Sequence, residues 1–246
     1  MSEIVITDDG PVRTIRMNRP DKKNALTLAM YDAMAAAIED SGARSRCLII
    51  AGARGAFCAG NDIGDFVKMA QSGGLAAPIL RFLHALARCE TPIIAAVSGP
   101  AVGVGATMLL HCDYVIAASD AKLSTPFVAL GLVPEAASSL IAPRLMGHAR
   151  AFSLLVLGQP LSAEEAKAAG IVNMVVAPAE LDAQAMEMAR AIAALPPEAV
   201  ITARRLMRGS AEEIVARIDE EAEAFKRRLE SPEAQAAFAA FLNRKP

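Results

Sequence analysis

Apolar and polar residues alternate near the start of the chain, in the segments EIVIT and RTIRM. The turn Asp8-Asp9-Gly10-Pro11 separates them, so the pattern predicts an opening β-hairpin. Further along, LTLAMYDAMAAAIED and AAPILRFLHALARC carry apolar residues at helical spacing, whereas RCLIIAG, IIAAVSG and DYVIAAS are short apolar runs typical of buried strands. Strands that alternate with helices predict parallel βαβ units, and therefore an α/β fold.

The alternation continues to about residue 180. Residues 138–158 have a helical pattern that we expect to break near Pro143. Ser162 and Glu165 have the spacing of a capping box at the start of the helix SAEEAKAAG, and IVNMVV predicts one more strand.

Beyond residue 180 the pattern predicts helices alone, the last starting at Ser231-Pro232. Ser210 and Glu213 predict the cap of a long helix with an apolar stripe, made of Ile214, Ile218, Ala222, Phe225 and Leu229. This stripe has to be buried, either on the protein's own core or in a subunit interface, and the pattern leaves both open.

The composition of the 246-residue chain supports this fold class and excludes several functions. Hydrophobic residues make up 54% and aromatic residues only 4%, which favours close packing of small side chains in a helix-rich α/β protein. The net charge of −2 offers no basic surface to nucleic acid, and no apolar run reaches membrane-spanning length. The first ten residues lack the basic region of a signal peptide, so we expect a cytoplasmic protein.

Four cysteines and three histidines are scattered without a C-x-x-C pair or another metal-binding spacing. We therefore expect buried thiols in a reducing compartment, with no disulfide framework and no bound metal. His111 stands next to Cys112, but adjacent residues in a helix or strand point apart, which argues against a catalytic pair.

Two glycine-rich loops are candidates for binding negative charge. The segment 52–66, GARGAFCAGNDIGDF, is a turn in which Asn61-Asp62 can open a helix, and the segment 98–108, SGPAVGVGATM, follows a predicted strand. Taken separately, the first loop is typical of a strand-to-helix turn with an Asp cap. The second is an incomplete G-x-G-x-x-G dinucleotide-binding fingerprint, and this partial match leaves a nicotinamide dehydrogenase as an alternative. One backbone N–H from each loop would make an oxyanion hole.

Glu135 lies within an apolar stretch, LGLVPEAASS, residues 130–139. Locally, Pro134 fits the first position of a helix and Glu135 its first turn, where a negative charge is favourable. The alternative is a catalytic base with apolar neighbours. Burial would raise the pKa of this carboxyl and a helix N-terminus would lower it, and the sequence does not decide which effect is larger.

The motifs RPDKKNALT, GAFCAGND and the block from PIIAAVSGPAVGVG to LGLVPEAASS resemble the crotonase superfamily of enoyl-CoA hydratases and isomerases. The likeness runs through the chain to AFAAFLNRKP at its end. It implies an α/β spiral of ββα units in residues 1–190 and a helical trimerisation region in residues 191–246. It also implies an acyl-CoA thioester as substrate, coenzyme A as part of that substrate with no separate cofactor, and a homotrimer or a dimer of trimers.

The same resemblance assigns roles to particular residues. The backbone amides of Asn61 and Val104 match the oxyanion donors of the family, although glycine is common at the position of Val104. The segment KKNAL matches the loop that holds the CoA adenine. The expected substrate and CoA contacts are Lys23, Ala25, Ala59, Asp62, Ile63 and Phe127, with Phe241 and Arg244 expected at the ligand of a neighbouring subunit.

The chain departs from the hydratases of the family at both acid/base positions. Hydratases use two glutamates there, and the alignment of motifs places Thr107 at the first and Phe127 at the second. Neither side chain can exchange a proton as a carboxylate does. Glu135, in the segment TPFVALGLVPEAASS, instead matches the proton-shuttling glutamate of the peroxisomal-type Δ3,Δ2-enoyl-CoA isomerase branch, so the resemblance implies an isomerase.

Three other functions remain open at this point. One is a different crotonase-type reaction on a CoA thioester, including weak hydration or thioester hydrolysis. Another is an acyl-CoA-binding protein without catalysis, and the last is the dehydrogenase mentioned above.

Overall fold

The computed structural model describes residues 2–53, 55–62, 64–65 and 75–242. Residues 241 and 242 are described by their backbone alone. Its main sheet has six strands in the order β1-β2-β3-β4-β6-β9. These strands are β1 (Ile4–Asp9), β2 (Val12–Met17), β3 (Cys47–Gly52), β4 (Ile93–Val97), β6 (Tyr114–Ala118) and β9 (Met174–Val176). β1 and β2 form the predicted antiparallel hairpin, and all further neighbours pair in parallel.

A second, smaller sheet has the order β5-β7-β8 and follows the end of β4. Its strands are β5 (Pro100–Val102), β7 (Lys122–Ser124) and β8 (Leu161–Ser162). The sequence pattern did not predict them, because strands of two or three residues are too short to show alternation and form only through long-range pairing. β5 is functionally important, since it directs the chain into the second glycine-rich loop.

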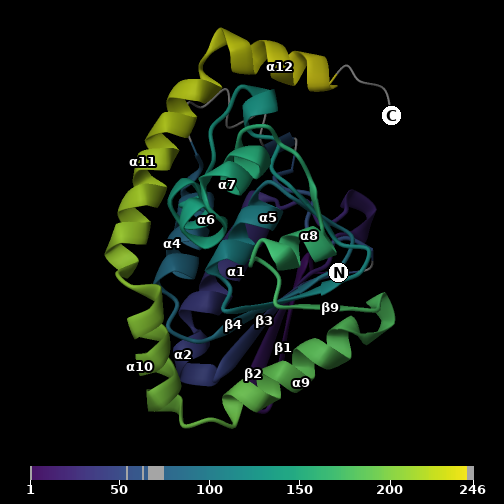
Figure 1. Ribbon diagram of the computed structural model, residues 1–246, viewed down its shortest axis with the longest axis vertical. Coiled ribbons are helices and arrows are strands. Elements are labelled where there is room, and N and C mark those ends of the chain that lie inside the picture. Colours follow the sequence, from purple (N-terminus) through teal and green to yellow (C-terminus); the bar gives the residue numbers. More distant parts are fainter. Residues whose placement is uncertain (1, 54, 63, 66–74, 243–246) are drawn as a thin grey trace.

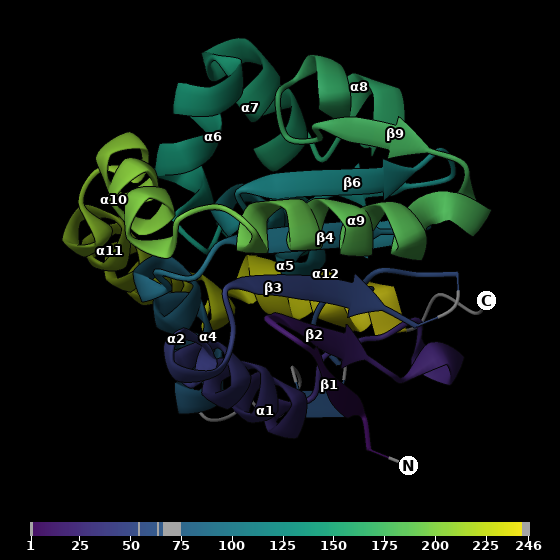
Figure 2. The same ribbon diagram turned by 90° about the horizontal axis from the view of Figure 1, so that it is seen from below.

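Helices cover both faces of the main sheet. One face packs against α9 (Leu181–Ala193), whose buried residues form a small cluster with β2, β3, β4 and β6. Figure 2 shows α9 running alongside the strands, in front of β4 and between β6 and β3. The other face packs against α1 (Leu28–Glu39) and α4 (Ala77–Arg88) in the main core. The short helices α2 (Ser41–Arg44), α5 (Val104–Thr107) and α8 (Ala163–Ala168) complete the α/β part, together with the 3-10 turns Pro20–Lys22, Met108–His111, Val128–Leu130 and Pro178–Glu180.

The local signals at helix ends are largely confirmed. The predicted Ser162–Glu165 capping box starts α8, and Ser210 accepts from the amide of Glu213 at the start of α11 (Ala211–Leu229), as predicted. Thr27, whose capping role was not predicted from the sequence, caps α1. The predicted break near Pro143 is wrong. Pro143 lies inside α6 (Ser138–Met146), and the chain turns at Gly147, with φ 78°, before α7 (His148–Leu155) begins.

The C-terminal helices are α10 (Pro197–Arg208), α11 and α12 (Pro232–Leu242). Figure 1 shows α11 running along one side of the molecule and α12 crossing its upper end. Four residues of the predicted stripe are buried in the chain's own core, namely Ile214, Ile218, Phe225 and Leu229. α12 lies so close to Gly131 that a Cβ there would come within 2.7 Å of the Cα of Ala234. The tail therefore packs on its own subunit at this face.

The helices of the described ranges include none with the length and apolar composition needed to cross a membrane.

Candidate active site

The two glycine-rich loops lie against each other at the end of β4. The amides of Phe57 and Cys58 both donate to the carbonyl of Pro100, each at 3.1 Å, and the amide of Val102 donates to the carbonyl of Cys58 at 2.8 Å. Cys58 and Ala101 thus form a short parallel bridge. Segments more than forty residues apart in the sequence are brought into backbone contact by these bonds.

Each loop presents a backbone amide directly after a glycine with positive φ. Gly60, with φ 93°, precedes Asn61, and Gly103, with φ 56°, precedes Val104 at the first position of α5. Among the residues that the structure describes, neither the Asn61 nor the Val104 amide donates to a protein acceptor. Two unpaired donors on adjoining loops are what an oxyanion hole requires.

Close packing fixes the spacing between the two loops. A Cβ on Gly105 would lie 2.6 Å from the carbonyl oxygen of Cys58, so only glycine allows α5 to approach this closely. On the other side, the buried Tyr31 hydroxyl of α1 donates to Oδ1 of Asn61 at 2.5 Å. The backbone of each donor loop is therefore held by a rigid element behind it.

Glu135 is buried, with 1% of its surface exposed. Neither carboxyl oxygen has a hydrogen-bond partner that meets normal geometry in the described part of the chain. Burial, reinforced by the negative charge of Glu221, raises the pKa of Glu135 to about 8, although the nearby Thr107 hydroxyl opposes the shift. Cys58 in the first loop and Thr107 in α5 both interact electrostatically with this carboxyl, which places it beside the two donor loops.

The backbone after Glu135 has an unusual conformation. Ala136 and Ala137 have φ values of 61° and 52°, in the left-handed region that non-glycine residues rarely adopt. α6 begins at Ser138, as the helical pattern over residues 138–158 predicts, so the alternative in which Pro134 and Glu135 open the helix is wrong. Glu135 lies outside the first turn, the helix N-terminus does not offset its burial, and burial determines the direction of its pKa shift.

Two buried polar side chains hold this left-handed turn. Glu221 of α11 accepts hydrogen bonds from the amide of Ala137 at 2.6 Å and from the amide and hydroxyl of Ser139 at 3.0 and 2.5 Å. His111 Nε2 lies 2.8 Å from the carbonyl of Ala136 and donates to it. Such strain persists where surrounding bonds over-determine it, so Glu221 and His111 are positioning residues for the Glu135 side chain.

The residues expected near the CoA are partly brought together. The amide of Ala59 donates to the carbonyl of Lys23 at 2.9 Å, and Leu26 pairs with Asn61 in a parallel bridge, so the segment 23–26 runs beside 59–62. Lys23 is exposed and Ala25 and Ala59 are half-buried beside it. These three residues border one open edge next to the first donor loop.

Asp62 has a structural role in this arrangement. Its carboxylate forms an ion pair with Arg19 at 2.7 Å and accepts from the amides of Gly64 and Asp65. Burial raises the pKa of Asp62, but Arg19 and these amides more than offset that effect and hold it below the usual value. The expected contact of Asp62 with the substrate or CoA stays a prediction, and in this structure its carboxylate is already bonded to Arg19 and to these amides. Ile63, the side chain of Phe241, and Arg244 lie outside the described residues.

Comparison with known proteins is consistent with this geometry. Residues 8–246 match the enoyl-CoA hydratase/isomerase family. The chain belongs to this family. It is 33% identical to enoyl-CoA delta isomerase 2 of Rattus norvegicus over 99% of this chain and 64% of that protein, so it spans less than two thirds of that relative. It is also 33% identical to a probable enoyl-CoA hydratase of Rhizobium meliloti over 92% of this chain and 87% of that protein.

The fold agrees with solved structures of the same group. The structure of Pseudomonas aeruginosa OdaA superposes with a TM-score of 0.94 and 44% identity, covering 99% of this chain and 100% of that chain. The expected α/β fold with parallel strands and C-terminal helices is thereby confirmed. The names of the relatives include both isomerases and hydratases, so family membership does not distinguish between the two reactions.

Thr107 and Phe127, the side chains predicted at the hydratase acid positions, both lie at the candidate site. Thr107 is buried, its hydroxyl donates to the carbonyl of Gly103 at 3.3 Å, and it is close to Glu135. Phe127 is also buried, and its ring lies 3.9 Å from where a Cβ of Gly103 would be. Among the described residues, Glu135 is therefore a carboxyl that the structure brings next to the two donor loops.

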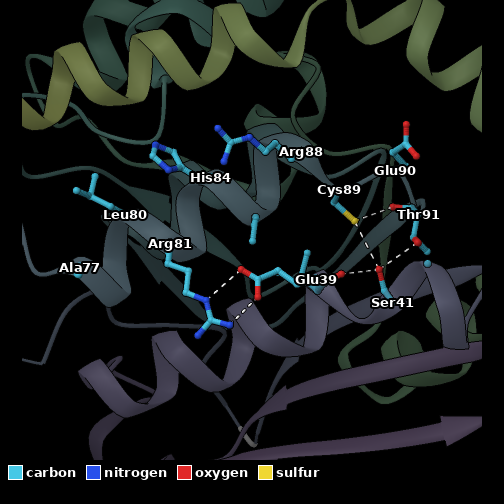
Figure 3. A pocket seen from close by; sticks show the side chains of 13 residues that line it. Glu39, Ser41, Ala77, Leu80, Arg81, His84, Arg88, Cys89, Glu90 and Thr91 are labelled. Atoms are coloured by element: carbon cyan, nitrogen blue, oxygen red, sulfur yellow. Dashed lines mark hydrogen bonds and ion pairs between the residues drawn. The ribbon is translucent and has the colours of Figure 1, made fainter.

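A cavity of about 670 Å³ between α1 and α4 is a separate feature. Figure 3 shows Arg81 reaching across it to Glu39, with Ser41, Cys89 and Thr91 hydrogen-bonded at its far end. Neither Glu135 nor the donor loops line it, so this cavity does not belong to the candidate site.

Three residues of the site were absent from the sequence-based expectations: Tyr31, His111 as a support, and Glu221. The separation of Glu221 from Ala137 by 84 positions left no local signal. His111 and Cys112 do not form a pair, since His111 bonds to Ala136 and the Cys112 thiol to the carbonyl of Met108.

Proposed function

We propose that the protein is a Δ3,Δ2-enoyl-CoA isomerase that uses Glu135 as its only proton-transfer group. The observation that carries the proposal is one buried, unpaired carboxyl beside two unpaired backbone amides, with threonine and phenylalanine at the hydratase acid positions. Moving a double bond adds and removes nothing, so one carboxylate suffices, whereas adding water needs both a base and an acid.

In the proposed mechanism the thioester oxygen of a 3-enoyl-CoA accepts hydrogen bonds from the amides of Asn61 and Val104. Glu135 removes a proton from C2, and the negative charge that develops on the oxygen is stabilised by these two donors. The protonated Glu135 then delivers the proton to C4, and the double bond is left between C2 and C3. Lys23, Ala25, Ala59, Asp62 and Ile63 are proposed to border the CoA, and Phe127 the acyl chain.

The buried setting suits this chemistry. A carboxylate with a pKa near 8 is a stronger base than a solvated one, and its protonated form is stable enough to hold the proton between the two transfers. The strained turn at Ala136 and Ala137 holds the Glu135 carboxyl in place. Glu221 bonds to the amide of Ala137 and His111 to the carbonyl of Ala136, and these bonds fix the turn.

The direct test is to assay the purified protein with a 3-enoyl-CoA and with a 2-enoyl-CoA. We expect the double bond of the 3-enoyl-CoA to migrate. Hydration of the 2-enoyl-CoA should be slower than this migration by at least about 10²-fold, since general acid–base assistance for water addition is missing. Hydration at comparable rates, or thioester hydrolysis, would assign a different reaction of the family. Binding of CoA without turnover would indicate a non-catalytic protein, and saturable NAD binding a dehydrogenase.

The proposed base predicts a specific pH dependence. Glu135 must be ionised to accept the proton, and its pKa is about 8, so kcat/KM should rise about tenfold per pH unit below that value and level off above it. Glu221→Gln removes the second negative charge and should move the midpoint to lower pH. Glu223→Gln, an exposed change on the same helix, should leave the midpoint unchanged. A profile without a transition between pH 6 and 9 argues against Glu135 as base.

We also propose that the chain assembles as a homotrimer or a dimer of trimers, through residues 191–246. The support is that α10 exposes Leu206 and Met207, at 81% and 83% of their surface, although the stripe of α11 is buried on its own core. Sedimentation equilibrium should give a mass of three or six chains, and Leu206→Glu with Met207→Glu should shift it toward the monomer. A wild-type monomer at micromolar concentration contradicts the proposal.

A further inference from the structure

A cavity of about 300 Å³ lies where the end of α4 meets the junction between α10 and α11. Figure 1 shows α10 and α11 following one another along the left side of the molecule, with this junction between them. Four arginines line the cavity, Arg88, Arg204, Arg205 and Arg208, of which Arg88 also appears at the end of α4 in Figure 3. The volume far exceeds the roughly 30 Å³ that one water molecule occupies in the liquid.

Arg204 is the arginine of this cavity whose side chain is buried and held in place by hydrogen bonds. It is buried, with 7% of its surface exposed. Its Nε donates to both carboxylate oxygens of Asp113, at 2.7 and 2.8 Å, and its Nη1 donates to the carbonyl of Cys89. These bonds fix the guanidinium in one orientation. Its Nη2 is buried and has no acceptor in the described part of the chain.

Arg208 stands one helical turn after Arg204, so both side chains lie on the same face of α10. Its Nη1 is likewise buried without an acceptor among the described residues, and no carboxylate there comes within ion-pair distance of it. Burial, together with the positive charge of Arg204, lowers the pKa of Arg208. The positive charges of Arg204 and Arg208 thus lie close together, and each guanidinium has one buried nitrogen without an acceptor among the described residues.

The remaining charges of the cavity do not compensate this pair. Arg205 is paired with Glu90 at 2.6 Å, and Asp113 is already paired with Arg204. Glu212 accepts from the Ser210 hydroxyl and lies near Arg88. The start of α11, a helix of 19 residues, adds the partial positive charge of its N-terminus at Ser210 and Ala211. Water could satisfy the free donors but would leave the excess positive charge in place.

We propose that this cavity is a binding site for a phosphate group, held between Arg204 Nη2 and Arg208 Nη1 at the start of α11. A dianionic, tetrahedral oxyanion offers several acceptors at once and offsets the charge of both arginines. Inorganic phosphate and the phosphates of a nucleotide share this chemistry.

The site is distinct from the candidate active site. Asp113 stands just before β6 and accepts from the amide of Ile93, the first residue of β4, so Arg204 is anchored at the amino ends of these parallel strands. The second glycine-rich loop follows the opposite end of β4, and the first, which follows β3, lies against it. A ligand in this cavity would brace the α10–α11 corner without contact to Glu135.

The test is calorimetric titration of the whole protein with inorganic phosphate at pH 7, in chloride at constant ionic strength. We expect saturable binding to one site per chain. Arg208→Met should weaken it at least about tenfold, because one charged donor is lost, and Arg208→Lys should weaken it less. Arg227→Met changes the net charge equally on the exposed side of α11 and should leave binding unchanged.

Titration with uridine 5′-monophosphate, which lacks the adenine that the expected CoA-binding loop would hold, distinguishes the two sources of the phosphate. Tighter binding than inorganic phosphate that depends on Arg208 indicates a nucleotide, and equal or weaker binding indicates the free anion. The proposal is overturned if wild-type protein shows no saturable phosphate binding, or if the folded Arg208→Met and Arg208→Lys variants, checked by circular dichroism, bind phosphate as the wild type does.

Discussion

Glu135→Gln should lower kcat for double-bond migration by about 10²–10⁴-fold while KM changes little. Glutamine has nearly the same shape, so packing is preserved and the loss reports on proton transfer. Because the carboxyl oxygens have no hydrogen-bond partners among the described residues, we expect the variant to fold and to be at least as stable as the parent near neutral pH, where the parent keeps a titratable group buried.

A second readout separates catalysis from binding in this variant. Exchange of the C2 protons of the bound thioester with deuterated solvent should fall in parallel with kcat, since the same group removes that proton. Glu223→Gln serves as the matched control and should retain full activity. Activity within a few-fold of wild type in Glu135→Gln would show that another group transfers the proton, and the proposed mechanism would then be wrong.

Gly105→Ala should lower kcat by about 10²–10³-fold, the range typical of losing one oxyanion donor. A backbone N–H cannot be deleted by a side-chain change, but its position can be altered. The added Cβ would lie 2.6 Å from the Cys58 carbonyl oxygen and 2.8 Å from its Cβ. Since this contact is mostly with backbone, α5 and the first loop must move apart, and the amides of Asn61 and Val104 lose their common geometry.

This substitution also carries a stability cost from overpacking, about 1–3 kcal/mol, which urea unfolding should detect. Activity is therefore compared at a temperature where the variant is fully folded. Gly42→Ala is the control, because Gly42 has no positive φ and no atom within 4 Å of an added Cβ. An active Gly105→Ala protein with a normal kcat would show that the spacing of the two loops does not control the oxyanion donors.

Much of the fold could be predicted because its signals are local. The hairpin of β1 and β2, the helices α1 and α4 and the capping box at Ser162 each follow from residues within one element. The short strands of the second sheet were not predicted, because their pairing joins residues such as Leu123 and Leu161 that are far apart in the chain.

The position of Glu135 shows where local reasoning failed. Proline before an acidic residue favours a helix start, yet Ala136 and Ala137 adopt left-handed conformations and α6 begins at Ser138. Nothing in an Ala-Ala pair predicts that conformation. It is imposed by Glu221 and His111, which belong to other elements and supply the hydrogen bonds that the strained backbone needs.

The sequence by itself determined the fold class, the two glycine-rich loops and the presence of Thr107 and Phe127 where the resemblance predicts hydratase acids, because these depend on residue identity and short-range spacing. The tertiary structure alone decided the ionisation behaviour of Glu135. Burial raises its pKa and a helix N-terminus lowers it, and which effect prevails depends on where the carboxyl lies relative to solvent and to the first turn of α6. The chain buries it outside that turn and beside Glu221, so the pKa of Glu135 rises to about 8.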